Sequence, residues 1–492
     1  MKNFYFILLI IFLTSCGVNN HTSFSPKRKF SVQKMQEDYS ILRNIYEKSH
    51  PGIYWYTSKD SMDYFFDSGY TKIKDSMTEP EFKNLLSQTI QHIKCGHSST
   101  KYSRKYDYHL FNNRLPQFPL QLKVLNDSLV MLFNAHRKDS LFYRGAIITS
   151  INGYKAKKII DTLCSVISTD GVSLNFKYQQ ITNNFPYYYS GVFGVQKDYT
   201  IKYITKEGIE STTTIKAYKP AEDSLRRIGI TASLIPKKTK KQVRQEKRLQ
   251  TFSASIDTFN KLAILNVNTF GSNLKRRFIK RAFKQIKNSG IQHIAIDLRL
   301  NGGGLINKSI YLARYLKNSP FRFMDSVVAV NNKLTSGKYI HHRFVYTVGL
   351  WFLTKKGRDG NYHFRLFENR LYSPKKQNFF KGKIYLLTGG NTFSAASLFA
   401  SSLKGQANVV VVGEETGGGY YGNNGVFIPD IVLPNTHIRV RLPLFRVVNN
   451  KSFTKDGHGV KPDIEVMPTV QTIMRNIDPK MEKIRELVKQ NQ

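Results

Sequence analysis

The sequence predicts an α/β fold in its C-terminal half, preceded by a helical segment and a β-rich segment. From residue 262 onward, short apolar runs of strand length alternate with runs of helical periodicity. Residues 33–97 carry two helical patterns, and residues 115–218 carry strand-like runs with a hairpin signal at Asn152-Gly153. We therefore expect a helical domain at 33–97, a β-rich domain at 115–218, a basic linker at 226–255 and an α/β core at 256–470.

The composition is that of a folded protein with an extreme charge. Of the 492 residues, 41% are hydrophobic and 13% aromatic, which suffices for several cores, and the formal net charge is +41. A solvated basic surface that faces anionic envelope lipids or glycans accounts for this charge. A nucleic-acid partner would also need a binding motif, which the sequence lacks, so nucleic acid is not expected as a partner.

The first of three cysteines ends a segment that has the pattern of a lipoprotein signal. Residues 1–16 combine Lys2, a short apolar run and a small-residue cleavage site before Cys16, and the run is too short to span a bilayer. We expect lipidation of Cys16 and a lipid-anchored place in a bacterial cell envelope, at the periplasmic face or the cell surface. Cys95 and Cys164 then remain, which leaves one disulfide open and forms no CxxC metal pattern.

The second helical pattern of the N-terminal segment leads to a histidine. It starts at the T-E-P-E run of residues 78–81 and ends at Cys95, after which Gly96 suits a C-terminal cap. His97 and Ser98 then lie on the loop just past the helix. A lone loop histidine is more often incidental than catalytic, so its role depends on finding a serine and a carboxylate for it.

The β-rich segment contains a run that resembles part of a PDZ domain. Residues 129–133 and 145–151 have strand character, and residues 155–166 have a helical pattern. The run R-G-A-I-I-T-S-I-N-G-Y at 144–154 resembles the strand, turn and helix entrance of a PDZ domain. The carboxylate-binding loop of that domain is not evident, so we expect a PDZ-like fold, and whether it captures peptides stays open.

Two strand-turn-helix units organise the predicted core. In the first, strand 294–298 and helix 306–316 flank Gly302, Gly303 and Gly304, whose backbone suits phosphate or an oxyanion. The G-x-G-x-x-G pattern and a P-loop lysine are both absent. In the second unit, strand 384–387 leads to a helix at Ser394, which this stretch alone leaves open as a nucleophile or as an N-cap.

Four motifs in this order carry a family resemblance. They are I-A-I-D-L-R-L-N-G-G-G at 294–304, T-G-G-N-T-F-S-A-A-S-L-F-A at 388–400, V-V-G-E-E-T-G-G-G at 411–419 and D-G-H-G-V-K-P-D-I at 456–464. Together they strongly resemble the C-terminal processing, or tail-specific, serine peptidases. The resemblance implies a crotonase/ClpP-like spiral α/β core, a polypeptide substrate, and neither cofactor nor metal.

The resemblance also implies a role for each site residue. Gly419 stands where the serine-lysine branch of the family has its lysine, so the sequence resembles the tricorn-like branch instead. In that branch a histidine matching His97 is the base, an acid matching Asp456 orients it, and Ser394 is the nucleophile. The backbone amides expected to hold the oxyanion are those of Gly302, Gly303, Gly304 and Ala395.

Two departures from the family pattern keep alternatives open. Cys95 replaces the usual aspartate and Ser98 the usual threonine, although neither change removes a proton-transfer group. A catalytically inactive peptide- or glycan-binding lipoprotein and an esterase remain as alternatives. If the peptidase interpretation is right, an unperturbed imidazole pKa of about 6.5 predicts activity that rises through roughly pH 6 to 7.5.

Overall fold

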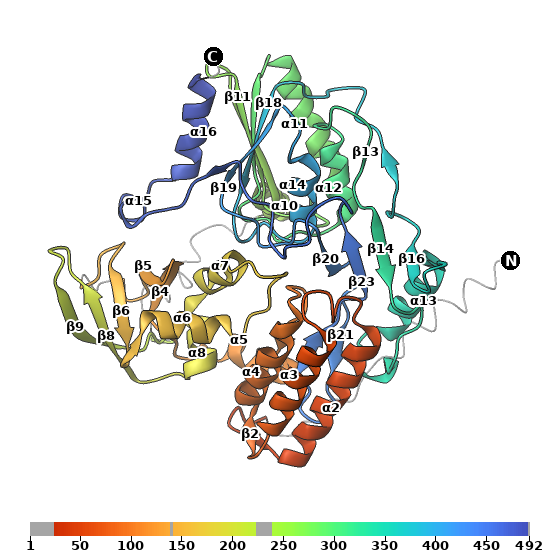
Figure 1. The fold of residues 1–492 in the computed structure, drawn as a ribbon. Coiled ribbons are helices and arrows are strands. Elements are labelled where there is room, and N and C mark those ends of the chain that lie inside the picture. Colours follow the sequence, from red (N-terminus) through yellow and green to blue (C-terminus); the bar gives the residue numbers. More distant parts are fainter. Residues whose placement is uncertain (1–23, 138–140, 223–238, 491–492) are drawn as a thin grey trace.

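The computed structural model describes residues 24–137, 141–222 and 239–490 in three packed regions (Figure 1). The predicted signal segment with Cys16, and residues 226–238 of the predicted linker, lie outside the described residues. Within the described part, no helix is long and apolar enough to cross a membrane.

The C-terminal region is the predicted α/β core, built on a six-stranded sheet of order β10-β11-β12-β18-β19-β24. β10 pairs antiparallel with β11, and every later pairing in this sheet is parallel. The strands are β10 (Phe252–Asp257), β11 (Leu262–Val267), β12 (His293–Asp297), β18 (Lys383–Thr388), β19 (Val409–Gly413) and β24 (Ile464–Glu465).

Alternate side chains of β18 point to opposite faces of the sheet, and this explains why its sequence is apolar throughout. Ile384 and Leu386 belong to the buried cluster that includes the helices of one face, whereas Tyr385 and Leu387 pack with Ile484 on the other face. A parallel sheet covered on both faces needs apolar residues at odd and even positions alike. The covering helices are α11 (Arg276–Asn288), α12 (Ile306–Ala313) and α14 (Ala395–Leu403) on the first face and α16 (Pro479–Gln490) on the second.

The N-terminal region is helical, as predicted, and consists of α2 (Val32–Ser49), α3 (Lys59–Thr71), α4 (Glu79–Ile90) and the 3₁₀ turn η2 (Gln91–Ile93). Thr78 and Glu81 form a capping box at the start of α4. The predicted cap at Gly96 is wrong, because Lys94 makes the left-handed turn with φ of 56°. Gly96 is instead required by space, since a Cβ there would lie 2.7 Å from the Phe393 ring.

Two contacts dock the helical region onto the core. β3 (Thr100–Lys101) extends the sheet of β21 (Asp430–Val432) and β22 (Arg439–Arg441) by antiparallel pairing with β22. The buried carboxylate of Asp38 on α2 accepts hydrogen bonds from the amides of Asn435 and Thr436 at 3.0 and 2.8 Å.

The β-rich insert has its own sheet, of order β4-β5-β6-β8-β9, and its own buried cluster. The hairpin predicted at Asn152-Gly153 is confirmed between β6 and β7. Helices α7 and α8 were not predicted. The strands are β4 (Leu120–Leu125), β5 (Ser128–Asn134), β6 (Ile147–Ile151), β7 (Tyr154–Lys155), β8 (Asp198–Ile204) and β9 (Glu210–Lys216), and the helices are α6 (Ala156–Cys164), α7 (Asn175–Asn183) and α8 (Phe185–Phe193).

A second core sheet, of order β15-β16-β14-β23-β20, had no counterpart in the sequence prediction. The predicted linker range also contains α10 and the first four residues of β10, so the core begins earlier than residue 256. The remaining elements are β1 (Lys29–Phe30), β2 (Met77–Thr78), α5 (Arg104–Asn112), α10 (Lys240–Thr251), β13 (Phe321–Arg322), β14 (Ser326–Ala329), η3 (Gly337–Tyr339), α13 (Arg343–Leu353), β15 (Thr354–Lys356), β16 (Tyr362–Phe364), β17 (Leu371–Tyr372), β20 (Gly422–Gly425), β23 (Phe445–Val448) and α15 (Val470–Met474).

Candidate active site

Ser394 stands at the sharp turn between β18 and α14, with a φ of 55° and a ψ of −125°. A non-glycine residue at positive φ costs on the order of 1 to 3 kcal/mol, so the surrounding contacts must hold it there. Thr392 supplies two of them, since its hydroxyl donates to Leu298 O at 2.9 Å and accepts from Gly389 N at 3.1 Å. These angles place Ser394 on a sharp strand-to-helix turn of the kind that exposes a nucleophilic serine. An ordinary N-cap residue does not need such a strained backbone.

His97 comes from the loop after η2 and meets Ser394 across the domain boundary. Its Nε2 lies 3.0 Å from Ser394 Oγ, and the His97 side chain is almost completely buried. Burial, reinforced by the positive charge of Arg441, lowers the pKa of His97 to about 3. The imidazole is therefore neutral at physiological pH, in the state that accepts a proton.

A second histidine supports the loop that carries His97. His50 Nε2 lies 3.1 Å from Ser98 Oγ, and Tyr46 stacks on the His50 ring with 5.5 Å between the ring centroids. Both aromatic residues are on or next to α2, so the helical domain fixes the backbone on which His97 stands.

The glycine loop after β12 lies against the nucleophile. A Cβ at Gly303, whose φ is 102°, would lie 2.7 Å from Ser394 Cβ. Of the four amides expected to hold the oxyanion, that of Gly303 already donates to Asn301 Oδ1 at 2.9 Å. Within the described residues, the amides of Gly302, Gly304 and Ala395 donate to no protein acceptor, which leaves three of the four available.

Asp456 does not make the expected contact with the imidazole of His97. Its side chain is exposed and accepts a hydrogen bond from His458 N at 2.9 Å, while Nδ1 of His97 is buried and has no partner in the described protein. The physical reason is the insert, because Val172 N donates to Gly457 O at 2.9 Å and this packing fixes the loop that bears Asp456.

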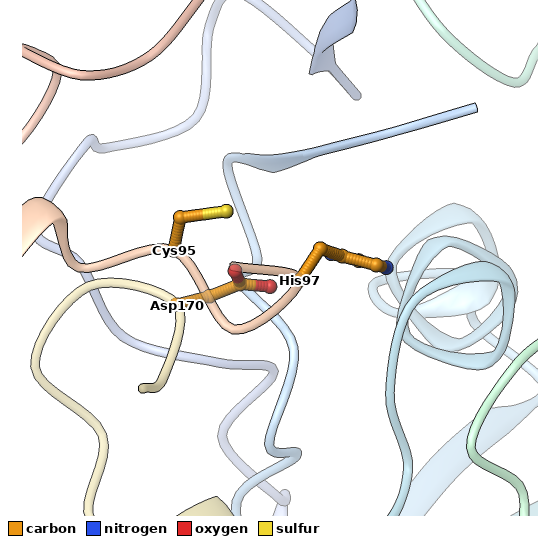
Figure 2. Close-up of side chains that lie close together, drawn as sticks. All are labelled: Cys95, His97 and Asp170. Carbon is orange, nitrogen blue, oxygen red and sulfur yellow. The ribbon is translucent and has the colours of Figure 1, made fainter. Parts of the chain in front are cut away.

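A different carboxylate lies beside His97. Asp170, from the insert segment between α6 and α7, is buried and accepts from Gly96 N at 2.8 Å through Oδ1, while its Oδ2 has no partner among the described residues. Figure 2 shows the Asp170 carboxylate between the side chains of Cys95 and His97, and the nearest ligand atoms of all three lie within 4.8 Å of one another. Burial raises the pKa of Asp170 to about 7.

The same three side chains have the residue types of a metal site, but Cys95 argues against that use. Both Cys95 and Cys164 are free thiols, and burial raises the pKa of Cys95 to about 12. A thiol that stays protonated is a poor metal ligand, and one nitrogen of His97 already faces Ser394. The cluster is therefore better explained as a carboxylate placed beside the imidazole than as a metal site.

Residues 261–466 match the model of peptidase family S41. These residues, which form most of the α/β core, belong to peptidase family S41. The chain is accordingly a serine-type peptidase, and this agrees with the resemblance drawn from the four motifs. The chain matches no curated protein sequence.

Solved structures share the fold of this S41 peptidase at low sequence identity. Mature CPAF aligns with a TM-score of 0.64 and 14% identity, over 93% of this chain and 97% of CPAF. Mature CPAF complexed with lactacystin aligns with a TM-score of 0.65 and 15% identity, over 93% and 98%. The photosystem II D1 C-terminal processing protease is more distant, with a TM-score of 0.41 and 13% identity over 90% and 96%.

A cleft of about 520 Å³ opens on the Ser394–His97 pair of the S41 peptidase. The insert forms one wall of it, and Phe176 of α7 stacks on Phe393 with 4.5 Å between the ring centroids. Sequence reasoning missed Asp170 and the cleft residues of the insert, since none stands in a recognisable motif. The apolar and aromatic lining consists of Val166, Ile167, Phe176, Tyr187, Tyr188, Phe393 and Ile428.

The close approach of Gly303 to the nucleophile gives a test. Gly303→Ala would force Ser394 or the loop to move, and we expect labelling of Ser394 by a fluorophosphonate probe to slow by at least about 100-fold, as when an oxyanion donor is lost. Gly405→Ala is the matched control, because Gly405 also has a positive φ of 84° but a Cβ there meets nothing within 4 Å. Equal labelling rates for the two variants would remove Gly303 from the site.

Proposed function

We propose that this S41 peptidase hydrolyses peptide bonds of exported polypeptides in the manner of tail-specific peptidases, with Ser394 as nucleophile and His97 as general base. The observation that carries the proposal is the 3.0 Å contact between His97 Nε2 and Ser394 Oγ at the mouth of a peptide-sized cleft. The neutral state of the buried imidazole and the available amides next to Ser394 support the same roles.

In this mechanism Ser394 Oγ attacks the substrate carbonyl carbon while its proton passes to His97 Nε2. The negative charge that develops on the carbonyl oxygen is held by amides from the set of Ala395, Gly302 and Gly304. One such donor is typically worth about 3 to 4 kcal/mol of barrier. His97 then protonates the leaving amine, and water releases the acyl group from Ser394 by the same route.

Asp170 is proposed as the acidic partner in place of Asp456. When His97 Nε2 accepts the serine proton, Nδ1 must carry a hydrogen, and the unpartnered Asp170 Oδ2 is the nearby acceptor for it. An ionised Asp170 would stabilise the imidazolium cation that forms as Ser394 reacts. The acid would thus come from the insert, whereas base and nucleophile come from the other two regions.

The envelope location is proposed from the sequence and from the surface charge. Lipidation at Cys16 would tether the chain to a membrane surface. α11 carries six exposed cations and no acid, so it is suited to anionic lipids or glycans. These residues are Arg276, Arg277, Lys280, Arg281, Lys284 and Lys287.

The alternative of an inactive binding lipoprotein finds less support, because the serine, the base and the donor amides all keep a reactive arrangement.

Ser394→Ala and His97→Ala should each lose nearly all peptide turnover, and the double variant should lose little more, since the two groups act as one unit. Turnover of peptides and fluorophosphonate labelling are the two measurements. A His97→Ala enzyme that keeps most of its activity while Ser394→Ala is inactive would show that another group is the base.

The proposed role of Asp170 predicts a pH profile different from that of an ordinary histidine. Because the pKa of His97 is far below 6 and that of Asp170 is about 7, kcat/KM should rise through pH 7 as Asp170 ionises. Asp170→Asn should lower kcat/KM at pH 8 by at least about 100-fold and flatten the profile between pH 5 and 8. Asp456→Asn is the control and should keep the wild-type profile.

The same variant carries a stability test. The pKa of the Asp170 carboxyl is raised from 3.8, its value in the unfolded chain, to about 7 in the folded chain. The carboxyl group therefore contributes stability that is fully present below pH 3.8 and is lost as the pH rises through about 7. Asp170→Asn should therefore be more stable than wild type at pH 8, by about 2 to 4 kcal/mol, and nearly equal to it at pH 4. Denaturant melts at the two pH values measure this, and a less stable variant at pH 8 would contradict the buried, ionised carboxylate.

The lipid anchor predicts that Cys16 is the modified residue. Metabolic labelling with a fatty-acid analogue should mark the wild-type chain and leave Cys16→Ala unmarked. Cys164→Ala serves as the control for loss of a thiol elsewhere. Equal labelling of wild type and Cys16→Ala would reject the anchor without bearing on the chemistry at Ser394.

A further inference from the structure

Helix α13 exposes large apolar side chains at the edge of the molecule (Figure 1). After Arg343 this helix contains no charged residue. Four of its side chains are between 60% and 77% exposed, and their spacing of i, i+1, i+7 and i+8 places them on one side of the helix. We call them the outer face of α13; they are Phe344, Val345, Trp351 and Phe352. An exposed apolar cluster of this kind marks a contact surface.

The opposite side of α13 packs on the core and leaves the outer face exposed. Leu350 is buried, and the Tyr346 and Phe427 rings meet with 5.8 Å between their centroids. A Cβ at Gly349 would lie 2.8 Å from the Phe427 ring. A helix that is apolar on both sides is normally buried, so the outer face is suited to an apolar partner from outside the described residues.

The segment that contains α13 is basic. Between Asp325 and Asp359 the sequence has no aspartate or glutamate, and Asp359 itself is hydrogen-bonded to His363. The positive charge of this segment is therefore not balanced within it. Its exposed cations are Lys333, Lys338, Arg343, Lys355, Lys356 and Arg358.

This combination favours a membrane as the partner over a second copy of the chain. In a symmetric dimer through the outer face, the basic segments of the two copies would lie against each other, and like charges repel. A bilayer that contains anionic lipids supplies the opposite charge. Tryptophan and phenylalanine enter the boundary between headgroups and acyl chains, while lysine and arginine keep their charges at the headgroups.

The start of the described chain is linked to α13 by two contacts. Phe24 packs on α5, with 5.9 Å between its ring centroid and that of Tyr106. From α5, Arg104 Nη2 lies 2.5 Å from Nε2 of His341, which is two residues before the start of α13. Cys16 precedes Phe24 by eight positions, which span at most about 29 Å, so a lipid on Cys16 would hold this part of the molecule close to the membrane.

We propose that the outer face of α13 docks into an anionic membrane surface, together with the lipid anchor proposed for Cys16. The choice of a membrane as partner rests in part on that proposed anchor. A lipid on Cys16 restrains how far the chain can move from the membrane, whereas a second contact at α13 also fixes its orientation. Binding through an acyl chain and a basic, apolar surface together is stronger than binding through either alone.

Trp351 makes the docking measurable, because the chain has only one other tryptophan, Trp55. The mature Trp55→Phe protein is mixed with vesicles of phosphatidylcholine and phosphatidylglycerol, with and without bromine on the acyl chains. Bromine quenches tryptophan at close range, and the apolar face of a docked helix lies about 5 to 10 Å deep, so we expect the Trp351 emission to fall by at least about half. Trp351→Phe, which keeps Trp55, is the matched control and should lose little emission.

Two variants in the Trp55→Phe background test the apolar contact. Phe352→Glu should abolish most of the quenching, because it places a charge on the outer face. Phe259→Glu, at a 90% exposed position between β10 and β11, should keep the quenching. Equal effects of the two changes would overturn the proposal.

The charge contribution is tested in the same background. Lys355→Gln with Lys356→Gln should weaken the quenching in anionic vesicles toward its value in phosphatidylcholine alone. Lys202→Gln with Lys216→Gln removes two exposed cations from the insert and should have no such effect.

Flotation of the vesicles separates the anchor from the docking. A chain that floats with the vesicles while Trp351 stays unquenched would overturn the docking and leave the anchor in place. A chain that does not float with phosphatidylcholine vesicles would reject the anchor, and quenching in anionic vesicles would then still decide whether the outer face docks. A dimer in detergent that Phe352→Glu dissociates, together with unquenched Trp351, would assign the face to a second copy. None of these outcomes bears on the chemistry at Ser394.

Discussion

The hydrogen bond between His97 and Ser394 joins residues 297 positions apart, and the rest of the structure is arranged so that it can form. A contact of 3.0 Å tolerates little error in how the helical region sits on the core. That placement is fixed by β-pairing of Thr100 and Lys101 with β22 and by the buried Asp38 carboxylate, which satisfies two backbone amides of the core. Removing the Asp38 acceptor would leave both amides unpaired, and the buried amide of Thr436 alone would cost about 1 to 3 kcal/mol.

The insert completes this arrangement through one short segment. Gly171 N donates to Lys94 O at 3.0 Å and Val172 N donates to Gly457 O at 2.9 Å, so the segment binds the helical region on one side and the core on the other. A Cβ at Gly171 would lie 2.0 Å from Gly457 O, which makes glycine necessary at this crossing. Because Asp170 directly precedes this glycine, the contact that locks the three regions also sets the carboxylate beside His97.

The sequence predicted those parts of the fold and the site that local sequence patterns determine, and it missed those that depend on packing between distant segments. Ser394 and the glycine loop stand at the ends of strands whose apolar runs are short and clear, and the motif order supplied His97. The expected contact between Asp456 and His97 is absent because whether Asp456 faces His97 depends on packing against the insert, which no local pattern records. Asp170 has no motif around it, and the insert helices α7 and α8 begin at Asn175 and Phe185 with weak helical patterns.

The site combines an unpaired buried nitrogen on His97, an unpaired buried oxygen on Asp170 and an unpaired buried nitrogen on Arg441. In a core of ordinary contacts each of these would cost stability without return. At rest, burial keeps the imidazole neutral and raises the pKa of the Asp170 carboxyl to about 7, so Asp170 carries a charge only above that pH. In the proposed mechanism an ionised Asp170 gains an imidazolium partner when the Ser394 proton moves to His97, and the attraction is strong because both groups are buried. In the proposed mechanism the unpaired atoms of His97 and Asp170 are those whose interaction the reaction completes.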